Sequence, residues 1–275
     1  MARDASLGDG KIIPSFRGLV AALQGKGFRI GRLRDTLEGE ARPDVMLRHD
    51  VDHQLDKALH FAELEAELGL SATYYLLPPG DYKKSKNYYG RLLFGRNWRS
   101  GALKAAVRKL TAMGHEVGLH TDLVQMASLT GRMPQDLLAE ELAWLRKAGA
   151  DVIGTAAHGS AFARRNDFVN YEIFEGLARN GKPVGRAIMD GGPQIKLHSL
   201  RMADFGLRYE AYHLPRGISL SDSGGKLKLL TPGKGNFDEY QLARGFQETF
   251  LSSADTFRAK PASLLFHPEW WSFTG

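Results

Sequence analysis

Charged and imidazole side chains are concentrated in the segment RHDVDH, Arg48 to His53, directly after the apolar residues that begin at Val45. Three more histidines follow short apolar stretches: His120 closes HEVGLH, His158 follows VIGTAA and His267 closes SLLFH. The chain has no cysteine, so a bound metal would need His, Asp or Glu as ligands. Carboxylates and imidazoles are also the groups that transfer protons in hydrolysis. If these segments converge in the fold, the sequence predicts a metal-dependent hydrolytic site.

These residue types supply every role that such a site needs. A divalent cation held by two imidazoles and one carboxylate keeps positions open for water and substrate. A second carboxylate can accept a proton from water, and a further imidazole can protonate the leaving group. Simpler roles exist for single residues, because Asp52 precedes a helical segment that it could cap, and His158 or His267 could make a structural hydrogen bond. A helix cap explains one aspartate of RHDVDH but not both.

Apolar stretches alternate with segments of helical spacing, which is typical of a parallel sheet covered by helices. We expect strands at Val45 to Arg48, Ala72 to Leu77, Glu116 to Leu119, Val152 to Ala156, Tyr209 to His213 and Ser263 to Phe266. Helical spacing occurs in residues 14–27, 54–69, 101–114, 134–149 and 167–181. The carboxyl ends of parallel strands meet at one mouth, so the aspartates and histidines above are expected to converge there.

Length and composition predict one enzyme-sized domain, residues 1–275, because 43% hydrophobic content in a chain of this length supports one large core. Residues 1–43 are expected to form an N-terminal helical extension packed on the barrel. The net charge of +6 favours an anionic partner such as nucleic acid, a phosphorylated lipid or an acidic glycan, although a generally basic surface is the commoner cause. Nucleic-acid binding ranks last, because neither a one-sided basic helix nor a known recognition motif is visible.

The sequence also gives an expectation of location. It contains no run of about 18 apolar residues that would span a bilayer. Its start, MARDASLGDGKIIP, lacks the basic and then apolar layout of a signal peptide. We therefore expect a cytoplasmic protein without a transmembrane segment, compatible with peripheral membrane contact.

A long polar and aromatic stretch, Pro78 to Arg99, separates two of the expected elements, and loops of this length are usually functional or mobile. Its basic residues, among them Lys86 and Arg91, could meet phosphates, and Tyr88 offers a flat face to a sugar ring. A solvated loop that keeps the protein soluble explains the same composition equally well. If the loop binds substrate, a nucleotide-linked or lipid-linked sugar fits better than an uncharged polymer.

Three segments, RHDVDH, GHEVGLHTD and LLFHPEWW, resemble in order and separation the motifs of the polysaccharide deacetylases of the NodB-homology type, a group similar to carbohydrate esterase family four. DVD and GHEVGLH are especially similar to the branch that deformylates aminoarabinose linked to a lipid carrier. The resemblance extends from Val45 to Trp271. It implies an α/β fold, an irregular (β/α)7 barrel, and a divalent metal. The nitrogen and oxygen ligands favour Zn²⁺.

The resemblance also implies roles for residues of the first two motifs. Asp50 matches the general base and Asp52 a metal ligand, although the order could be reversed because Val51 is inserted between them. His120 matches a metal-binding histidine of the second motif. His115 of GHE matches a histidine that is usually structural, and we interpret it so.

The later motifs supply the remaining roles. His267 matches the general acid of the family, and Leu265 matches the leucine that lines the acyl pocket. Trp270 and Trp271 would extend that apolar wall, although buried packing is the more common role for at least one of them. Asp222, in LSDSGG, resembles the acid of the fourth motif.

The chain departs from the family pattern at the second and third motifs. Val124 stands where the family has another histidine ligand, and His158 could replace it, with Asp122 as a nearer but less favoured substitute. His158 also stands where the family has an arginine that orients the base. Arg164 or Arg165 would have to compensate for that loss.

These observations lead to one main hypothesis and two rivals within the same fold. The hypothesis is removal of an acetyl or formyl group from an N-acylated sugar in surface polysaccharide or lipopolysaccharide biosynthesis. One rival is a non-catalytic glycan-binding relative, which the valine at position 124 suggests. The other is hydrolysis of a different C–N bond, and release of acetate or formate from an amino-sugar conjugate would argue against it.

Overall fold

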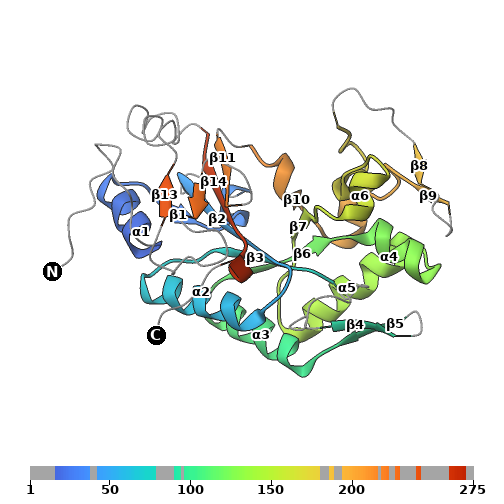
Figure 1. Ribbon diagram of the computed structural model, residues 1–275, viewed down its shortest axis with the longest axis horizontal. Helices are drawn as coiled ribbons and strands as arrows, with labels where there is room; N and C mark the ends of the chain where they lie inside the picture. The colour runs from blue at the N-terminus through green and yellow to red at the C-terminus, as the bar shows by residue number, and fades with distance from the viewer. Residues whose placement is uncertain are drawn as a thin grey trace.

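The computed structural model of the protein describes residues 16–37, 42–78, 90–93, 96–179, 186–188, 194–215, 218–222, 227–229, 240–242 and 260–270. One parallel sheet dominates these residues (Figure 1). Its strands are β1 (Ile30–Gly31), β2 (Val45–Val51), β3 (Thr73–Leu76), β6 (Glu116–Thr121), β7 (Gly154–Ala157), β10 (Tyr209–Glu210), β11 (Ile218–Ser221) and β14 (Ala262–Phe266). Their spatial order is β10-β7-β6-β3-β2-β14-β11, and β1 pairs with the start of β2.

Every pairing in this sheet is parallel, and the sheet curls into a half-barrel whose end strands among the described residues are β10 and β11. The expectation of a mixed α/β fold with a curled parallel sheet is confirmed at this level. All six expected strands are present, although β10 is shorter than predicted, and β1 and β11 were not predicted. In the described part of the chain, three antiparallel pairs lie outside the sheet: β4 (Gly90–Leu93) with β5 (Arg96–Arg99), β8 (Ala187–Ile188) with β9 (Ile195–Lys196), and β12 (Leu227–Leu229) with β13 (Tyr240–Leu242).

The helices follow the expected pattern with one exception. They are α1 (Phe16–Gly25), α2 (Leu55–Glu67), α3 (Gly101–Ala112), α4 (Leu123–Thr130), α5 (Pro134–Ala148) and α6 (Ala161–Arg165), with the 3₁₀-helices η1 (Arg34–Leu37), η2 (Asn170–Ile173), η3 (Met202–Phe205), η4 (Ala211–His213) and η5 (Pro268–Trp270). Figure 1 shows α2, α3 and α5 side by side along one side of the sheet. Four of the predicted helices are confirmed, whereas α4 and α6 were not predicted.

The helix predicted for residues 167–181 is wrong over its described part, residues 167–179, where only the short η2 forms. The side chain of Asn170 is buried and donates hydrogen bonds to the carbonyl of His158 and to Asp122. Phe174 then pairs as an isolated bridge with Leu200. Tertiary hydrogen bonds of this kind outweigh local helical spacing.

Alternate residues of the central strands face opposite sides of the sheet. On β2, Val45 and Leu47 belong to the large apolar cluster shared with the helices, whereas Met46 belongs to a smaller cluster inside the curl. Because side chains alternate along a strand, Arg48 and Asp50 face the inside with Met46. The carboxyl end of β2 therefore delivers charged groups to the mouth of the half-barrel.

Two tyrosine rings fill the inside of the curl. The hydroxyl of Tyr75 donates to that of Tyr209 at 2.9 Å, and the Tyr209 hydroxyl donates to Glu116 Oε1 at 2.7 Å. A Cβ atom at Gly118 would lie 2.4 Å from the Tyr75 ring, and one at Gly154 would lie 2.2 Å from the Tyr209 ring. Both glycines are therefore required to make room for the rings.

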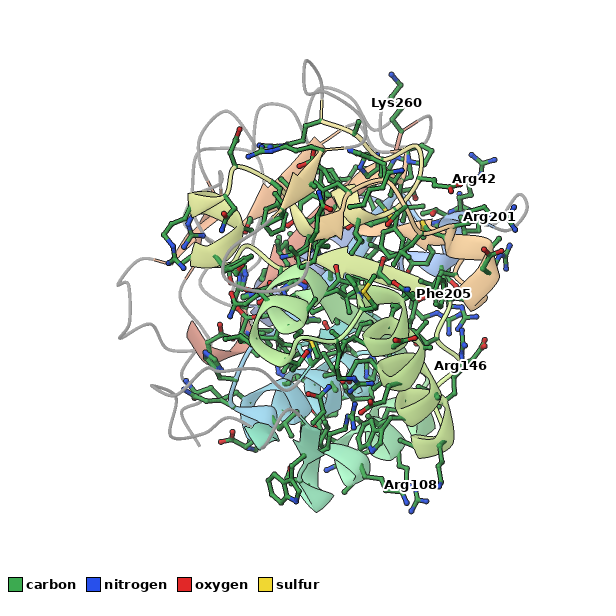
Figure 2. The ribbon with its side chains drawn as sticks, turned by 90° about the vertical axis from the view of Figure 1, so that its right-hand side faces the viewer. Arg42, Arg108, Arg146, Arg201, Phe205 and Lys260 are labelled. Atoms are coloured by element: carbon green, nitrogen blue, oxygen red, sulfur yellow. The ribbon has the colours of Figure 1, made fainter. Side chains whose placement is uncertain are left out.

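Basic side chains project from more than one part of the surface. Figure 2 labels Arg42, Arg108, Arg201 and Lys260, of which Arg108 lies in α3 and the other three precede β2, η3 and β14. In this view, Arg108 lies at the opposite end of the molecule from Lys260. Within the described ranges, no helix is long and apolar enough to cross a membrane.

Candidate metal centre

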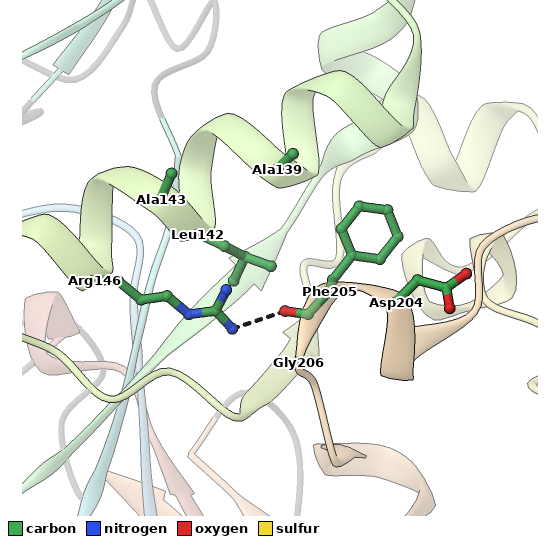
Figure 3. A pocket seen from close by; sticks show the side chains of 7 residues that line it. All are labelled: Ala139, Leu142, Ala143, Arg146, Asp204, Phe205 and Gly206. Atoms are coloured by element: carbon green, nitrogen blue, oxygen red, sulfur yellow. Dashed lines mark hydrogen bonds between the residues drawn. The ribbon is translucent and has the colours of Figure 1, made fainter.

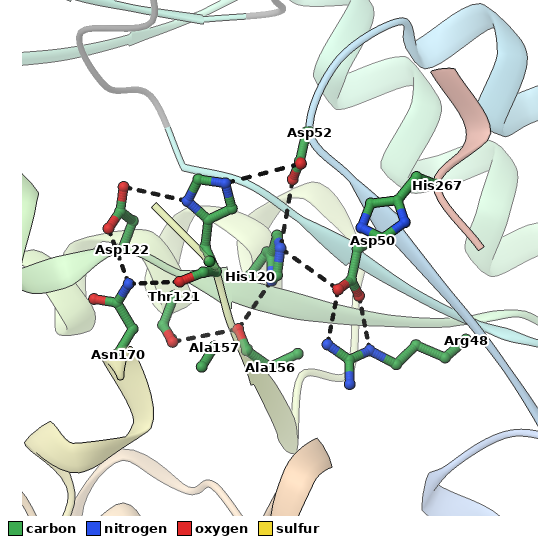
Figure 4. A network of polar contacts seen from close by, with 12 residues as sticks. Arg48, Asp50, Asp52, His120, Thr121, Asp122, Ala156, Ala157, Asn170 and His267 are labelled. Atoms are coloured by element: carbon green, nitrogen blue, oxygen red, sulfur yellow. Dashed lines mark hydrogen bonds and ion pairs between the residues drawn. The ribbon is translucent and has the colours of Figure 1, made fainter. Parts of the chain in front are cut away.

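Three side chains meet at the carboxyl ends of the central strands (Figure 4). Asp52 directly follows β2, His158 directly follows β7, and His120 is the penultimate residue of β6. One potential ligand atom from each residue lies within 4.8 Å of the other two. We call Asp52, His120 and His158 the metal triad. The structure thus brings together the three residues that the sequence analysis proposed as ligands.

The imidazole of His120 is held in the orientation that a ligand needs. Its Nδ1 donates a hydrogen bond to the carbonyl of Ala156 at 3.0 Å, which leaves the lone pair on Nε2 directed at Asp52. Burial lowers the pKa of His120, and the charges of Asp50 and Asp52 only partly oppose this effect. The side chain is therefore a neutral imidazole at neutral pH, which is the form that binds a cation.

His158 is oriented by a second layer of polar groups. Its Nδ1 donates to Asp122 Oδ2 at 3.3 Å, and Asn170 donates to Asp122 Oδ1 at 3.0 Å. Burial alone would lower the pKa of His158, but the hydrogen bond to Asp122 and the nearby carboxylates outweigh it and raise the pKa. Asp122, which was the less favoured ligand in the sequence analysis, lies behind the histidine and fixes its tautomer.

The spacing of the triad fits a small cation. His120 Nε2 lies 3.4 Å from Asp52 Oδ1, and His158 Nε2 lies 3.8 Å from Asp52 Oδ2. Zinc bonds of about 2.0–2.1 Å in a tetrahedron separate neighbouring ligand atoms by about 3.3 Å. Asp52 Oδ1 is buried and has no hydrogen-bond partner, and Gln54, not Asp52, is the N-cap residue of α2. A metal ligand explains this carboxylate better than a helix cap does.

Asp50 lies beside the triad and is paired with Arg48, a partner that the sequence analysis did not assign. The guanidinium donates two hydrogen bonds to the carboxylate, at 2.8 and 2.7 Å. Burial opposes ionisation of Asp50, but Arg48 and then His120 outweigh it and lower the pKa to about 2. The alternation of side chains on one strand could have revealed this pair, because the two residues are two positions apart.

His267 lies beside Asp50 in the labelled view and forms a pair with Asp222, which follows β11 (Figure 4). Asp222 accepts hydrogen bonds from the backbone nitrogen and from Nδ1 of His267, both at 2.7 Å. Burial would lower the pKa of His267, but the hydrogen bond and charge of Asp222, with that of Asp50, raise it to about 9. The imidazole is therefore protonated at neutral pH.

Glu269 is a further acidic group at the mouth that the sequence analysis did not assign. Burial raises its pKa to about 8, and the charge of Asp52 adds to that effect. Its Oε2 is buried without a hydrogen-bond partner, while its backbone carbonyl accepts from Lys57. The only signal in the sequence was its position two residues after His267.

The other residues expected at the site fall in different places. Leu265 lies in β14 opposite Arg48, buried at 7% exposure. Tyr88 and Lys86 lie outside the described residues. Arg91 falls in β4 and Trp270 in η5, but their side chains are not among those described.

The departures from the family pattern also have a structural explanation. Val124 is fully buried in α4, so it belongs to the core and not to the triad. The guanidinium of Arg164 donates to the carbonyl of Gly159, whereas Arg48 is the arginine that binds Asp50. His115 is buried between the nitrogen of Ala72 and the carbonyl of Ala62, as a structural histidine would be.

A separate cavity of about 380 Å³ lies between α5 and η3 (Figure 3). Arg146 spans it and donates to the carbonyls of Phe205 and Val152. Its lining residues are Ala139, Leu142, Ala143, Arg146, Asp204, Phe205 and Gly206. None of the triad residues lines this cavity, so it is distinct from the candidate metal centre.

Comparison of the chain with models of protein families, with curated proteins and with solved structures gave no match. The likeness to polysaccharide deacetylases therefore stays a prediction from short motifs. The chemistry of this site follows from the geometry of its own residues.

Proposed function

We propose that this protein is a metal-dependent hydrolase that removes an acetyl or formyl group from the nitrogen of an amino sugar. We further propose that its half-barrel is a divergent form of the polysaccharide deacetylase barrel, and that it acts in the synthesis of surface polysaccharide or lipopolysaccharide. One observation carries the proposal. The metal triad lies next to a carboxylate that is held ionised, Asp50, and an imidazole that is held protonated, His267.

Asp52, His120 and His158 would hold the cation, and zinc is the first choice for two nitrogen ligands and one carboxylate. When bound, a divalent cation supplies Lewis acidity, which lowers the pKa of water and polarises an amide carbonyl. Three protein ligands are the number that catalytic zinc sites commonly use. The donor set therefore suits a catalytic ion as well as a structural one.

Asp50 and His267 divide the proton transfers between them. The ionised Asp50 accepts a proton from water as the water oxygen bonds to the acyl carbon. The protonated His267 donates its proton to the amide nitrogen as the C–N bond breaks, which gives a carboxylic acid and an amine. Arg48 and Asp222 hold these two groups in their working protonation states.

The test is release of acetate or formate from N-acetyl and N-formyl amino sugars, presented free, nucleotide-linked and lipid-linked, by the zinc-loaded chain. Asp52→Ala should empty the metal site and abolish release. Asp50→Asn should keep the metal and lose turnover. Metal content by mass spectrometry and acid release by chromatography are measured on the same samples.

Asp44→Asn serves as the matched control, because Asp44 is a buried carboxylate that accepts a hydrogen bond from the backbone of Arg29. It should keep both metal and activity. A wild-type chain that holds less than about half an equivalent of metal would favour the non-catalytic relative instead. A chain that binds metal and releases neither acid from any of these sugars would contradict the proposed reaction.

A further inference from the structure

Glu269 is the middle residue of η5, the short helix that begins directly after His267. This helix contacts both β2 and α2. On the α2 side, the ammonium group of Lys57 donates a hydrogen bond to the backbone carbonyl of Glu269 at 2.9 Å. The backbone of Glu269 is therefore fixed at the edge of the sheet where the metal triad lies.

The carboxyl group of Glu269 has an oxygen for which the fold supplies no partner. Its Oε2 is buried and has no hydrogen-bond partner among the described residues. An unpaired buried polar atom costs free energy, and native structures keep few of them. Asp52 Oδ1 is a second such atom, and a cation at the triad accounts for it. Glu269 needs a different explanation, because it is not part of the described group of converging ligand atoms.

The charges of Asp52 and His267 both act on this carboxyl group. Burial is the largest cause of the raised pKa of Glu269, the charge of Asp52 raises it further, and that of His267 lowers it. Because the interaction between charges weakens with distance, the carboxyl group lies near both residues. In the proposed reaction, His267 protonates the amide nitrogen. A group beside His267 is therefore near the sugar carbons that surround this nitrogen.

We propose that the side chain of Glu269 binds the hydroxyl group on the sugar carbon next to the acylated nitrogen. The inference rests on the proposed function and deepens it, because it names the part of the substrate that distinguishes an amino sugar from other amides. A hydroxyl group both donates and accepts, so it can pair with the carboxyl group in either protonation state.

The substrate hydroxyl would give Oε2 the partner that the fold does not supply. Turning the carboxyl group towards the substrate breaks no hydrogen bond of Oε2, since this atom has none among the described residues. A site that is built to bind a hydroxyl group discriminates strongly against an analogue without it, because the protein group then stays unpaired. Glu269 is thus expected to determine specificity and not to transfer a proton.

The test compares the methyl glycoside of N-acetylglucosamine with its 3-deoxy analogue, which lacks the hydroxyl group next to the acylated nitrogen. The wild type should hydrolyse the glycoside with a kcat/KM about 10- to 100-fold higher than that for the analogue. Glu269→Ala should abolish this preference by lowering kcat/KM for the glycoside alone. Glu63→Ala changes a glutamate of α2 whose side chain is 39% exposed, and this control should keep the wild-type preference.

Three kinetic results would overturn the inference: equal kcat/KM of the wild type for the two substrates, a preference that persists in Glu269→Ala, or a loss in that variant that is equal for both substrates. An equal loss would mean that Glu269 supports the fold or the centre and not the hydroxyl group. If the wild type hydrolyses neither substrate, binding of each to the zinc-loaded chain is compared by saturation-transfer NMR, which tests the inference even where the proposed function fails. Tighter binding of the glycoside by the wild type, with equal binding of the two by Glu269→Ala, supports the inference. Any other binding result, including no binding by the wild type, overturns it.

Discussion

Arg48 and Asp50 form a bidentate ion pair on the inner face of β2, with hydrogen bonds of 2.8 and 2.7 Å and both side chains 3% exposed. A planar guanidinium matches the two carboxylate oxygens, so the pair fixes the direction of the carboxylate as well as its charge. Because Asp50 lies 3.6 Å from His120, this direction determines where a proton can be accepted beside the triad.

Arg48→Lys should lower kcat about 10- to 100-fold while the metal content stays unchanged. Lysine keeps the positive charge but cannot make two parallel hydrogen bonds, so Asp50 loses its fixed orientation. Steady-state kinetics and metal analysis on one preparation measure both quantities. Arg201→Lys, in an exposed pair with Asp204, is the control and should have wild-type kinetics. A wild-type kcat in Arg48→Lys would show that the bidentate geometry of the ion pair is not needed for turnover.

Asp122→Asn should weaken zinc binding about 10- to 100-fold without removing a ligand, because the asparagine no longer orients His158 through a charged acceptor. Competition with a chromophoric chelator measures the affinity. Asp44→Asn should leave it unchanged. If Asp122→Asn loses all metal, as expected for Asp52→Ala, then Asp122 is itself a ligand and the triad is wrongly assigned.

Activity should persist on the alkaline side up to about pH 9, where His267 loses its proton. Asp222→Asn removes the hydrogen bond and charge that raise this pKa, so the alkaline limb should move towards the ordinary histidine value of 6.5. The profile of kcat/KM against pH records the shift. His60→Gln, at an exposed position of α2, should not move the limb. An unshifted limb in Asp222→Asn would mean that another group sets it.

The same raised pKa has a consequence for stability. The folded pKa of His267 lies above the unfolded value of 6.5, so its contribution is fully present below that value and is lost as the pH rises through about 9. Urea unfolding of the wild type between pH 6 and 10 should therefore show a decline that is smaller in Asp222→Asn. Equal slopes in both proteins would contradict this assignment.

Gly118→Ala should destabilise the fold by about 1–3 kcal/mol, because its Cβ would overlap the Tyr75 ring inside the curl. The backbone carbonyl of Gly154, 2.9 Å from that Cβ, cannot move aside as a flexible side chain could. Gly25→Ala is the control, since no atom lies within 4 Å of a Cβ placed there. Urea unfolding measures the stability of both variants. Wild-type stability of Gly118→Ala would mean that the inside of the curl can accommodate the extra methyl group.

The sequence alone predicted the helices and strands that depend on local patterns. Apolar stretches identified the central strands, and helical spacing with Pro134 at the start identified α5. Where tertiary hydrogen bonds compete with local spacing, as at Asn170, the prediction failed. Local patterns carry no information about a partner that lies far along the chain, and Asn170 binds Asp122, 48 residues away.

The candidate site likewise has features that the sequence predicted and features that only the tertiary structure decided. The residue types and their positions at strand ends determined that Asp52, His120, His158 and His267 would be present at one mouth, because parallel strands end on one side of a sheet. Only the tertiary structure decided which of them share a centre. The order and curl of the strands bring β2, β6 and β7 together in space, placing Asp52 in the triad, Asp50 against Arg48 and Asp122 behind His158. Distances between separate strands depend on that curl, and no spacing along the sequence records it.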